Sequence, residues 1–350
     1  MHLDIYKNKR VLITGTTGFK GSWLSFWLNK LGAKVVGIGL KPEKDSFIFH
    51  SLSLNKSIKQ YYLNIKDRKK LDSIVKKEKP DIIFHLAAQS DVSRSVINPT
   101  ETFSTNVMGS LNILEVYKKN KIDALVYCTS DKCYENNEWI WGYREIDSLG
   151  GKDPYSASKA SAEILFNSFC RTYYPNKKIN KIGSVRAGNV LGGGDFKNNI
   201  ISDIIRSIIN KKNLTLKNPK STRPWQHVLE PLHGYLILGE KLLNNKLSVE
   251  IPSWNFGPNI EKQYTVKFIA SNLIKRWGSK TKIIIQKSSL DEAGLLMLNN
   301  EKAKLELGWK PKLSLDDTIQ FTYEWYYSYF ETKTDIIKLT ETQIDKFLSI

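Results

Sequence analysis

The sequence predicts an α/β fold, in which a doubly wound parallel sheet is followed by a smaller mixed α/β C-terminal domain. Two observations lead to this prediction. Short β-branched runs alternate with amphipathic stretches through the first half of the chain, and a glycine-rich turn follows the first of these runs. A chain of 350 residues is long enough for one large α/β domain with a smaller partner. The first half is therefore expected to be a Rossmann-like domain.

Five runs are expected to be buried strands of this sheet. They are Val11–Thr14, Lys34–Ile38, Asp81–Leu86, Ala124–Thr129 and Lys181–Arg186. A turn or a helix follows each run, as in repeated β-α-β units. Because a doubly wound sheet binds its ligands beyond the carboxyl ends of its strands, polar residues that follow strand ends are the candidates for a site.

Three glycines with G-x-x-G-x-x-G spacing separate the first strand from a helix that is expected to begin near Gly18. In such a turn the first glycine permits the tight bend, the second lets the backbone approach a pyrophosphate, and the third lets helix and strand pack closely. The helix N-terminus then faces the phosphates. The turn predicts a dinucleotide site. The expected contacts are Gly15, Thr17, Gly18, Phe19, Lys20, Gly21, Asn64, Ile65, Leu86, Ala87, Ala88, Gln89, Tyr155 and Lys159.

The sequence leaves the identity of the dinucleotide partly open. An acidic residue usually ends the second strand and binds the adenosine ribose of NAD, but Gly39, Leu40 and Lys41 stand there. We expect NAD, with NADP as an alternative. Asn64 is either an adenine contact or a solvated loop residue, and the small residues before Gln89 could equally serve helix packing alone.

The regular alternation ends after Gly194, where helices, short strands and proline turns take over. We assign residues 1–190 to the dinucleotide-binding domain, to which a segment of about residues 226–258 returns, beginning with a helix. Residues 191–225 and 259–332 are assigned to a substrate-binding domain. Residues 333–350 are polar and are expected to form a peripheral helix or a tail.

The composition argues against several classes of protein. No apolar run is long enough to span a bilayer and no signal-type segment precedes the first strand, so we expect a cytoplasmic protein without a membrane partner. The net charge of +18 is scattered rather than gathered in one stripe, which favours an anionic small molecule over nucleic acid as the partner. Cys128, Cys133 and Cys170 have neither disulfide-framework nor zinc-site spacing, and no metal is expected.

A Y-x-x-x-K pair, Tyr155 and Lys159, lies on a helix that is expected to begin with Asp153 as its N-cap and Pro154 in its first turn. Residues four apart share one face of a helix. A tyrosine acts as a base toward an alcohol only without its proton, and lowering its pKa from about 10 to about 7 requires about 4 kcal/mol. The positive charges of Lys159 and of a bound nicotinamide favour this ionisation. The pair therefore predicts oxidation of an alcohol.

Ser130, Asp131 and Lys132 follow the strand Ala124–Thr129 directly. The Ser130 hydroxyl can hydrogen-bond the oxygen that the tyrosine deprotonates, which steadies a developing alkoxide. A Y-x-x-x-K pair alone arises often by chance. Together with the glycine turn and a serine at a strand end, however, it resembles the short-chain dehydrogenase/reductase superfamily.

Longer strings resemble the CDP-glucose 4,6-dehydratases, in the extended branch of that superfamily. The strings are residues 18–23, 129–136, 141–145, 186–190, 192–195 and 222–231, so the match covers nearly the whole chain. The glycine turn and the Y-x-x-x-K pair occur throughout the superfamily. Ser130–Glu135 and Arg223–His227 are far more selective, and these two strings carry the prediction of the substrate.

The resemblance implies conversion of CDP-glucose to a 4-keto-6-deoxy sugar. Tyr155 would take the proton of the sugar 4-hydroxyl while hydride leaves C4 for the nicotinamide, and the 4-ketone would acidify the proton at C5. Water is then lost across C5 and C6, and hydride returns to C6. By the resemblance, protonated Asp131 is the acid for the departing 6-hydroxyl and Lys132 is the base at C5. Alternatively, Lys132 anchors a phosphate or is only a loop charge.

Three residues are candidates for binding the sugar nucleotide: Asn189, Arg206 and Arg223. An amide can hold a sugar or a phosphate, and a guanidinium group matches pyrophosphate oxygens in a bidentate manner. An ion pair on a helix surface would explain Arg206 equally well. Proteins of this family commonly dimerise through helices such as Thr100–Asn120 and Pro154–Phe169, so the resemblance implies a homodimer.

Two segments depart from the family pattern. Ser90–Ser93 stands where Pro-Leu-Val-Arg is expected, and Gly294 stands where a histidine is expected. These departures leave the reaction type intact but open the substrate to GDP-, UDP- or dTDP-sugars, including N-acetylated ones. A 4-epimerase is the alternative enzyme, and Asp131 with Lys132 favours elimination over it. A catalytically silent dinucleotide-binding regulator is the non-enzymatic alternative, against which the retained catalytic residues argue.

Overall fold

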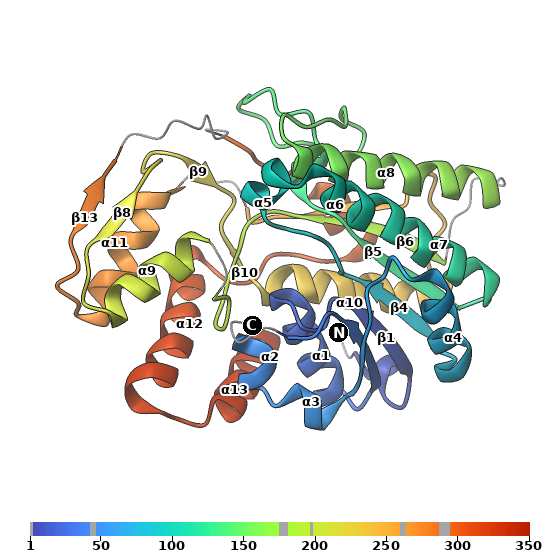
Figure 1. The fold of residues 1–350 in the computed structure, drawn as a ribbon, viewed down its shortest axis with the longest axis horizontal. Coiled ribbons are helices and arrows are strands. Elements are labelled where there is room, and N and C mark those ends of the chain that lie inside the picture. The colour runs from blue at the N-terminus through green and yellow to red at the C-terminus, as the bar shows by residue number, and fades with distance from the viewer. Residues whose placement is uncertain (1–2, 43–46, 175–180, 197–198, 260–263, 287–294) are drawn as a thin grey trace.

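The computed structural model describes residues 3–42, 47–174, 181–196, 199–259, 264–286 and 295–350. Its centre is a seven-stranded sheet in which every neighbouring pair of strands is parallel (Figure 1). The strands lie in the order β11-β6-β5-β4-β1-β2-β3. Their bounds are β1 Arg10–Thr14, β2 Lys34–Gly39, β3 Lys59–Tyr62, β4 Ile82–His85, β5 Ala124–Cys128, β6 Ile182–Ala187 and β11 Ser253–Phe256. The predicted fold class is confirmed, and each of the five predicted strands is present.

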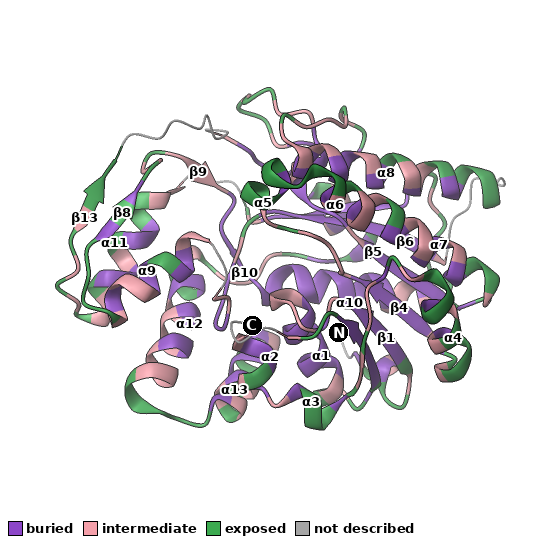
Figure 2. Ribbon diagram, viewed as in Figure 1, coloured by how far each residue is buried: buried purple, intermediate pink, exposed green. Residues whose placement is uncertain are grey.

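Helices cover both faces of the sheet because the strands are apolar on both sides. Along β1, Val11 and Ile13 pack into one core cluster while Leu12 packs into the other, as the two-residue period of a strand requires. The first cluster lies under α1 (Phe19–Lys30) and α10 (Leu229–Leu243). The second lies under α4 (Arg68–Glu78), α7 (Ser110–Lys119) and α8 (Pro154–Tyr173). Figure 2 shows the strands as a buried layer between these helices.

Short helical elements follow three of the strands, β2, β4 and β5. The helices α2 (Phe47–Ser51) and α3 (Leu54–Ser57) follow β2. The helices α5 (Val92–Ile97) and α6 (Pro99–Phe103) follow β4, and a π-helical segment, Ser104–Gly109, joins α6 to α7. One turn of 3-10 helix, Asp131–Cys133, follows β5. π-helical segments inside longer helices are frequent near functional sites.

The C-terminal elements form a second group beside the carboxyl edge of the sheet (Figure 1). Its helices are α9 (Ile200–Ile209), α11 (Val266–Trp277) and α12 (Leu315–Tyr327). Its short strands pair as β7 (Val190–Leu191) with β10 (Gln226–His227), β8 (Leu214–Leu216) with β13 (Ile283–Ile285), and β9 (Thr222–Arg223) with β12 (Tyr264–Thr265). Between these groups, α10 returns to the sheet and packs on β5 and β6.

The last helix, α13 (Ile336–Ser349), packs back onto the first helix rather than lying free. The ring of Phe347 meets the Trp27 ring of α1 edge-on at 5.8 Å. Lys30 and Asp345 form an ion pair of 3.2 Å across the same contact. Within the described residues, no helix combines the length and the hydropathy needed to cross a membrane.

Candidate active site

The glycine turn folds as its spacing predicts. Gly15 has a φ of +82°, and a Cβ added there would lie 2.8 Å from the backbone nitrogen of Ala87. A Cβ on Gly21 would lie 2.0 Å from the carbonyl oxygen of Gly15, so only glycine lets α1 sit this close to the turn. Gly18 is the N-cap of α1 and supplies no side chain to cap the first N–H groups. These donors and the narrow turn fit the pyrophosphate of a dinucleotide.

The residues expected at the adenine end lie in a turn after β3. The Asn64 side-chain oxygen accepts a hydrogen bond of 3.0 Å from the Lys66 backbone N–H. Ile65 is buried and packs closely on Gly109: a Cβ added to that glycine would lie only 2.6 Å from the Ile65 Cδ1 atom. The Asn64 amide therefore shapes its own turn, and its contact with adenine stays a prediction.

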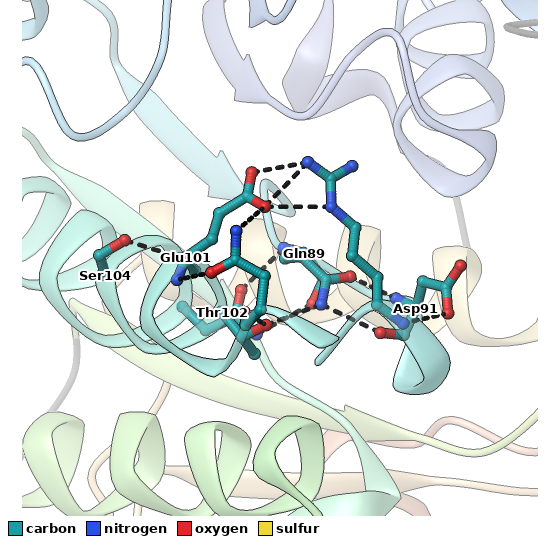
Figure 3. Close-up of polar contacts among 8 residues, drawn as sticks. Gln89, Asp91, Glu101, Thr102 and Ser104 are labelled. Atoms are coloured by element: carbon teal, nitrogen blue, oxygen red, sulfur yellow. Dashed lines mark hydrogen bonds and ion pairs between the residues drawn. The ribbon is translucent and has the colours of Figure 1, made fainter. Parts of the chain in front are cut away.

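A polar network holds Gln89, in the loop after β4 (Figure 3). The Gln89 amide nitrogen donates to the Asp91 carbonyl at 3.0 Å and to the Thr102 hydroxyl at 2.9 Å, and its amide oxygen accepts from the Asp91 N–H. Asn106, in the π-helical segment, bonds both backbone groups of Gln89 and also donates to the Ser158 hydroxyl at 2.9 Å. The network therefore connects the expected cofactor loop to α8, one residue before Lys159. Sequence reasoning did not single out Asn106.

The segment after β5 forms a tight turn, which we call the Ser130 turn (residues 130–133). The Ser130 hydroxyl donates to the Asp131 carboxylate at 2.9 Å and accepts from the Lys132 backbone N–H at 3.3 Å. Asp131 is only 3% exposed, and its second oxygen, Oδ2, has no hydrogen-bond partner in the described part of the chain. Burial raises the pKa of Asp131, against the charge of Lys132 and the Ser130 hydrogen bond. A carboxyl group in this state is suited to give up a proton.

Tyr155 and Lys159 face the Ser130 turn from α8. Asp153 caps this helix by accepting from the Ser156 N–H, as predicted, and Pro154 occupies its first turn. The Lys159 ammonium lies 6.0 Å from the centroid of the Tyr155 ring. Burial raises the pKa of Tyr155 above its ordinary value, while the neighbouring Ser130 side chain opposes this rise.

Positive charge is concentrated around these side chains. Burial, and secondly the charge of Lys20, lowers the pKa of Lys159 to about 8. Burial also lowers the pKa of Lys20, and the nearby Cys128, Asp131 and Asp195 oppose this fall. The sequence assigned Lys20 to the cofactor turn alone, whereas the structure brings its charge into the same site as Asp131 and Lys159. The sequence feature that could have indicated this role is the position of the lysine, two residues after the second glycine of the turn.

The three substrate candidates occupy different surroundings. Arg223 lies close enough to Asp131 for its charge to lower the pKa of that carboxyl. Asn189 is exposed just after β6. Arg206 lies over the Phe196 ring at 4.9 Å, donates to the Phe196 carbonyl oxygen, and is 3.7 Å from the Asp203 carboxylate. The structure therefore brings Arg223 to the Ser130 turn, while Arg206 is held by its own helix and the Phe196 segment.

Of the two departures from the family pattern, one lies in the described chain. Asp91 is the N-cap of α5 and accepts from the Arg94 N–H, so Ser90–Ser93 begins a helix beside Gln89. Gly294 lies outside the described residues. Among the described residues, no group of three or more His, Cys, Asp or Glu side chains is arranged to hold a metal ion.

Comparison with known proteins identifies the family of this fold and site. The family model described as GDP-mannose 4,6 dehydratase matches residues 12–322. The chain belongs to this family. A CDP-glucose 4,6-dehydratase of Salmonella typhimurium is 40% identical over 353 residues, which cover 99% of this chain and 98% of that protein. The predicted resemblance to nucleotide-sugar 4,6-dehydratases, a class of hydro-lyases, is thereby confirmed.

Solved structures share the fold at lower sequence identity. A UDP-glucose 4-epimerase from Thermotoga maritima superposes with a TM-score of 0.81 at 23% identity, covering 92% of this chain and 100% of that chain. A dTDP-glucose 4,6-dehydratase from Bacillus anthracis, solved in complex with NAD, gives a TM-score of 0.79 at 22% identity and covers 93% and 98%. Epimerases and dehydratases therefore share this fold, and the residues at the site must distinguish them.

Proposed function

We propose that the protein is an NAD-dependent CDP-glucose 4,6-dehydratase that forms CDP-4-keto-6-deoxyglucose. The observation that carries the proposal is the Ser130 turn, in which a buried carboxyl group lies near Tyr155 and has the charge of a lysine beside it. An epimerase needs only the redox pair, whereas loss of water also needs an acid and a base. The relative from Salmonella typhimurium supports the choice of CDP-glucose.

The redox step uses the α8 pair. The narrow turn at Gly15 and Gly21 and the uncapped N-terminus of α1 would hold the pyrophosphate of NAD. NAD supplies the acceptor for the hydride from C4 and later the donor of the hydride to C6. Lys159 stabilises the phenolate form of Tyr155, this phenolate takes the proton of the sugar 4-hydroxyl, and the Ser130 hydroxyl steadies the developing alkoxide.

The elimination step uses the Ser130 turn. Lys132 removes the proton at C5, which the neighbouring ketone acidifies, and the C5–H electron pair forms the double bond to C6. The C6–O bond breaks, and protonated Asp131 gives its proton to the departing hydroxyl, so that one water leaves. When hydride is later added at C6, Lys132 returns a proton, which has exchanged with the solvent, to C5. Burial favours the protonated form of Asp131 that this role requires.

The nucleotide and the sugar lie on the side of the C-terminal elements in this proposal. Arg223 is the best-supported contact for the substrate pyrophosphate, because its charge already acts at Asp131. Asn189 would bind the sugar or a phosphate from the end of β6. Arg206 would reach the substrate only by leaving the Phe196 carbonyl and ring. The division into residues 1–190 with about 226–258, and 191–225 with 259–332, belongs to the same proposal.

The test is incubation of the purified protein with CDP-, GDP-, dTDP- and UDP-sugars in deuterated water. The expected result is a 4-keto-6-deoxy product, with deuterium at C5, from CDP-glucose. Recovery of every sugar nucleotide unchanged would exclude a dehydratase, and a C4 epimer without water loss would favour the epimerase. Analysis of the dinucleotide released on denaturation distinguishes NAD from NADP.

We also propose a homodimer that forms through α7 and α8. The groove between these helices has the apolar side chains of Leu111, Leu165 and Phe169 in its lining, together with charged side chains of α4 and α7, and Ile164 of α8 is 57% exposed. Apolar surface of this kind is commonly buried in an interface. Sedimentation should give twice the mass of the chain for the wild type and a single chain for Ile164→Glu. A monomeric wild type would contradict the proposal.

A cytoplasmic location is part of the same proposal. Cys128, Cys133 and Cys170 are all free thiols, which suits a reducing compartment. Fractionation of cells with an antibody to the protein would test the location.

A further inference from the structure

A buried ion pair lies behind the Ser130 turn. Arg186 of β6 and Glu163 of α8 are joined at 2.7 Å between Nη2 and Oε2, and their side chains are 1% and 0% exposed. The mechanism proposed above gives neither residue a contact with substrate or cofactor. Burying a charged pair does not in general stabilise a fold more than apolar residues would. The pair therefore calls for another explanation.

The pair contacts the residues on both sides of the Ser130 turn. Thr129, which precedes the turn, donates its hydroxyl to the Glu163 carboxylate. Tyr134, which follows the turn, accepts a hydrogen bond of 2.8 Å from Arg186, and its ring lies 5.0 Å from the guanidinium carbon. The two ends of the turn are thus held by the two halves of one ion pair.

The same pair also connects the turn to the helix of the redox residues. Glu163 follows Lys159 by four residues on α8, which places both on one face of the helix. On the other side, the Tyr134 hydroxyl donates to the Asn255 side chain of β11 at 2.8 Å. The network therefore extends from α8, through the ends of the Ser130 turn, to the edge strand of the sheet.

We propose that the Glu163–Arg186 pair is a positioning clamp, which sets the Ser130 turn against Tyr155 and Lys159, and that Tyr134 transmits its hold to Asp131 and Lys132. The kinetic part of this inference rests on the proposed dehydratase function. Oxidation and elimination act on adjacent carbons of one sugar, so the catalytic groups of the turn and of the helix must keep fixed positions relative to one another. A displacement of a catalytic group by about 1 Å can slow a step by up to about 100-fold.

The first test is Tyr134→Phe, which removes one hydroxyl and keeps the ring. Reactions with CDP-glucose are quenched, and mass spectrometry measures two ketones, one that retains the 6-hydroxyl and the 6-deoxy product. We expect the 6-hydroxy ketone to accumulate and formation of the 6-deoxy product to fall about tenfold, because Tyr134 adjoins the elimination side of the turn. A wild-type ratio of the two ketones would overturn the proposal.

The opposite end of the turn gives a complementary variant. Thr129→Val removes the hydroxyl that Glu163 accepts from and nearly preserves the shape of the side chain. Because Thr129 adjoins Ser130, oxidation at C4 should slow, and both ketones should form more slowly without accumulation of the 6-hydroxy ketone. Loss of fold stability alone would not make the 6-hydroxy ketone accumulate in one variant and not in the other, and its accumulation in Thr129→Val would contradict the assignment of this end of the turn to oxidation.

Tyr143→Phe is the matched control. Tyr143 is buried and stacks on Tyr134 with ring centroids 5.1 Å apart, but its hydroxyl bonds Asn136 and Asn137 instead of Arg186. It should keep the wild-type ratio of ketones. Accumulation of the 6-hydroxy ketone in this control to the same extent as in Tyr134→Phe would show that aromatic packing, not the clamp, controls the step.

A second measurement needs no substrate. Amide hydrogen exchange of peptides that cover the Ser130 turn should be faster in Tyr134→Phe than in the wild type, and unchanged in Tyr143→Phe. If the wild type dehydrated no sugar nucleotide, the proposed function would fail while this comparison would still test the clamp. Equal exchange in the wild type and in Tyr134→Phe would overturn the clamp whatever the activity.

Discussion

Asp131 and Lys132 are neighbours in the sequence but lie in different environments. Asp131 is buried, with one carboxylate oxygen bonded to Ser130 and the other without a partner in the described chain, whereas Lys132 is half-buried. Burial favours the neutral acid at Asp131. The two side chains are therefore suited to the two roles of an elimination, one giving a proton and the other removing one.

Lys132→Ala is expected to oxidise C4 but to fail in the loss of water. The redox pair on α8 is untouched in this variant, while the base at C5 is missing. A catalytic base contributes about 100- to 10,000-fold, so 6-deoxy product should fall by that factor while the 6-hydroxy ketone accumulates. Mass spectrometry of quenched reactions measures both ketones. Lys152→Ala, at an exposed lysine, is the control, and normal dehydration by Lys132→Ala would disprove the role of the base.

The pH dependence of oxidation should follow Lys159, whose pKa is lowered to about 8. At lower pH both Tyr155 and Lys159 are protonated, and the pair must lose one proton before Tyr155 can act as a phenolate base beside a charged Lys159. The rate of C4 oxidation should therefore rise as the pH rises through about 8 and then level off. Lys20→Met removes a positive charge that helps to lower this pKa, so the rise should move to higher pH.

A rate–pH profile at saturating substrate and cofactor measures this shift. Lys69→Met, at an exposed lysine of α4, removes the same charge away from the site and should leave the profile unchanged. An unchanged profile in Lys20→Met would mean that Lys20 does not act on Lys159.

At the scale of elements, the strands were predictable because burial on both faces makes them continuous apolar runs. The edge strands β3 and β11 were not predicted as strands. β3 is only partly buried and reads Lys-Gln-Tyr-Tyr, and β11 is four residues long and contains Asn255. The π-helical segment Ser104–Gly109 depends on a backbone register that the helical pattern of the sequence does not reveal.

The candidate site likewise contains residues that the sequence predicts and residues that it does not. Ser130, Tyr155 and Lys159 were predictable because a strand end and a four-residue spacing on one helix identify them. The Glu163–Arg186 pair was not, since its partners lie on α8 and β6 and meet only when these elements pack. Contacts of this kind depend on tertiary structure, and local pattern carries no signal for them.

Gly21→Ala should abolish dinucleotide binding by displacing α1 from the glycine turn. Its Cβ would lie 2.0 Å from the Gly15 carbonyl oxygen, a backbone atom that cannot turn aside. Overpacking of this kind costs about 1–3 kcal/mol. Gly278→Ala is a control of similar cost, because Gly278 has a φ of +68° but open space around it, and strain there is about 1–2 kcal/mol.

Urea unfolding and the dinucleotide content of the purified variants separate the two effects. Both variants should lose stability, but only Gly21→Ala should lose the cofactor. Retention of the dinucleotide in Gly21→Ala would show that α1 does not need this close approach.

At the scale of the whole molecule, α13 connects the two ends of the chain. It packs on α1, and the Lys312 ammonium, which lies before α12, donates to the carbonyl of Phe347 at 3.2 Å. Phe347 is fully buried and contacts both Trp27 of α1 and His233 of α10. The last helix therefore covers the same face of the sheet that α1 and α10 cover, although its sequence is largely polar.

Phe347→Ala should accordingly lower the free energy of unfolding by about 3–5 kcal/mol, since it leaves a cavity between α13, α1 and α10. Urea denaturation measures this loss, and Ile350→Ala, at a residue 63% exposed, should change stability by no more than about 0.5 kcal/mol. Because the site lies at the carboxyl edge of the sheet, away from this contact, the folded variant should keep its ratio of ketones. A loss no larger than that of Ile350→Ala would mean that α13 contributes little to the core, and an altered ratio would mean that it also acts on the site.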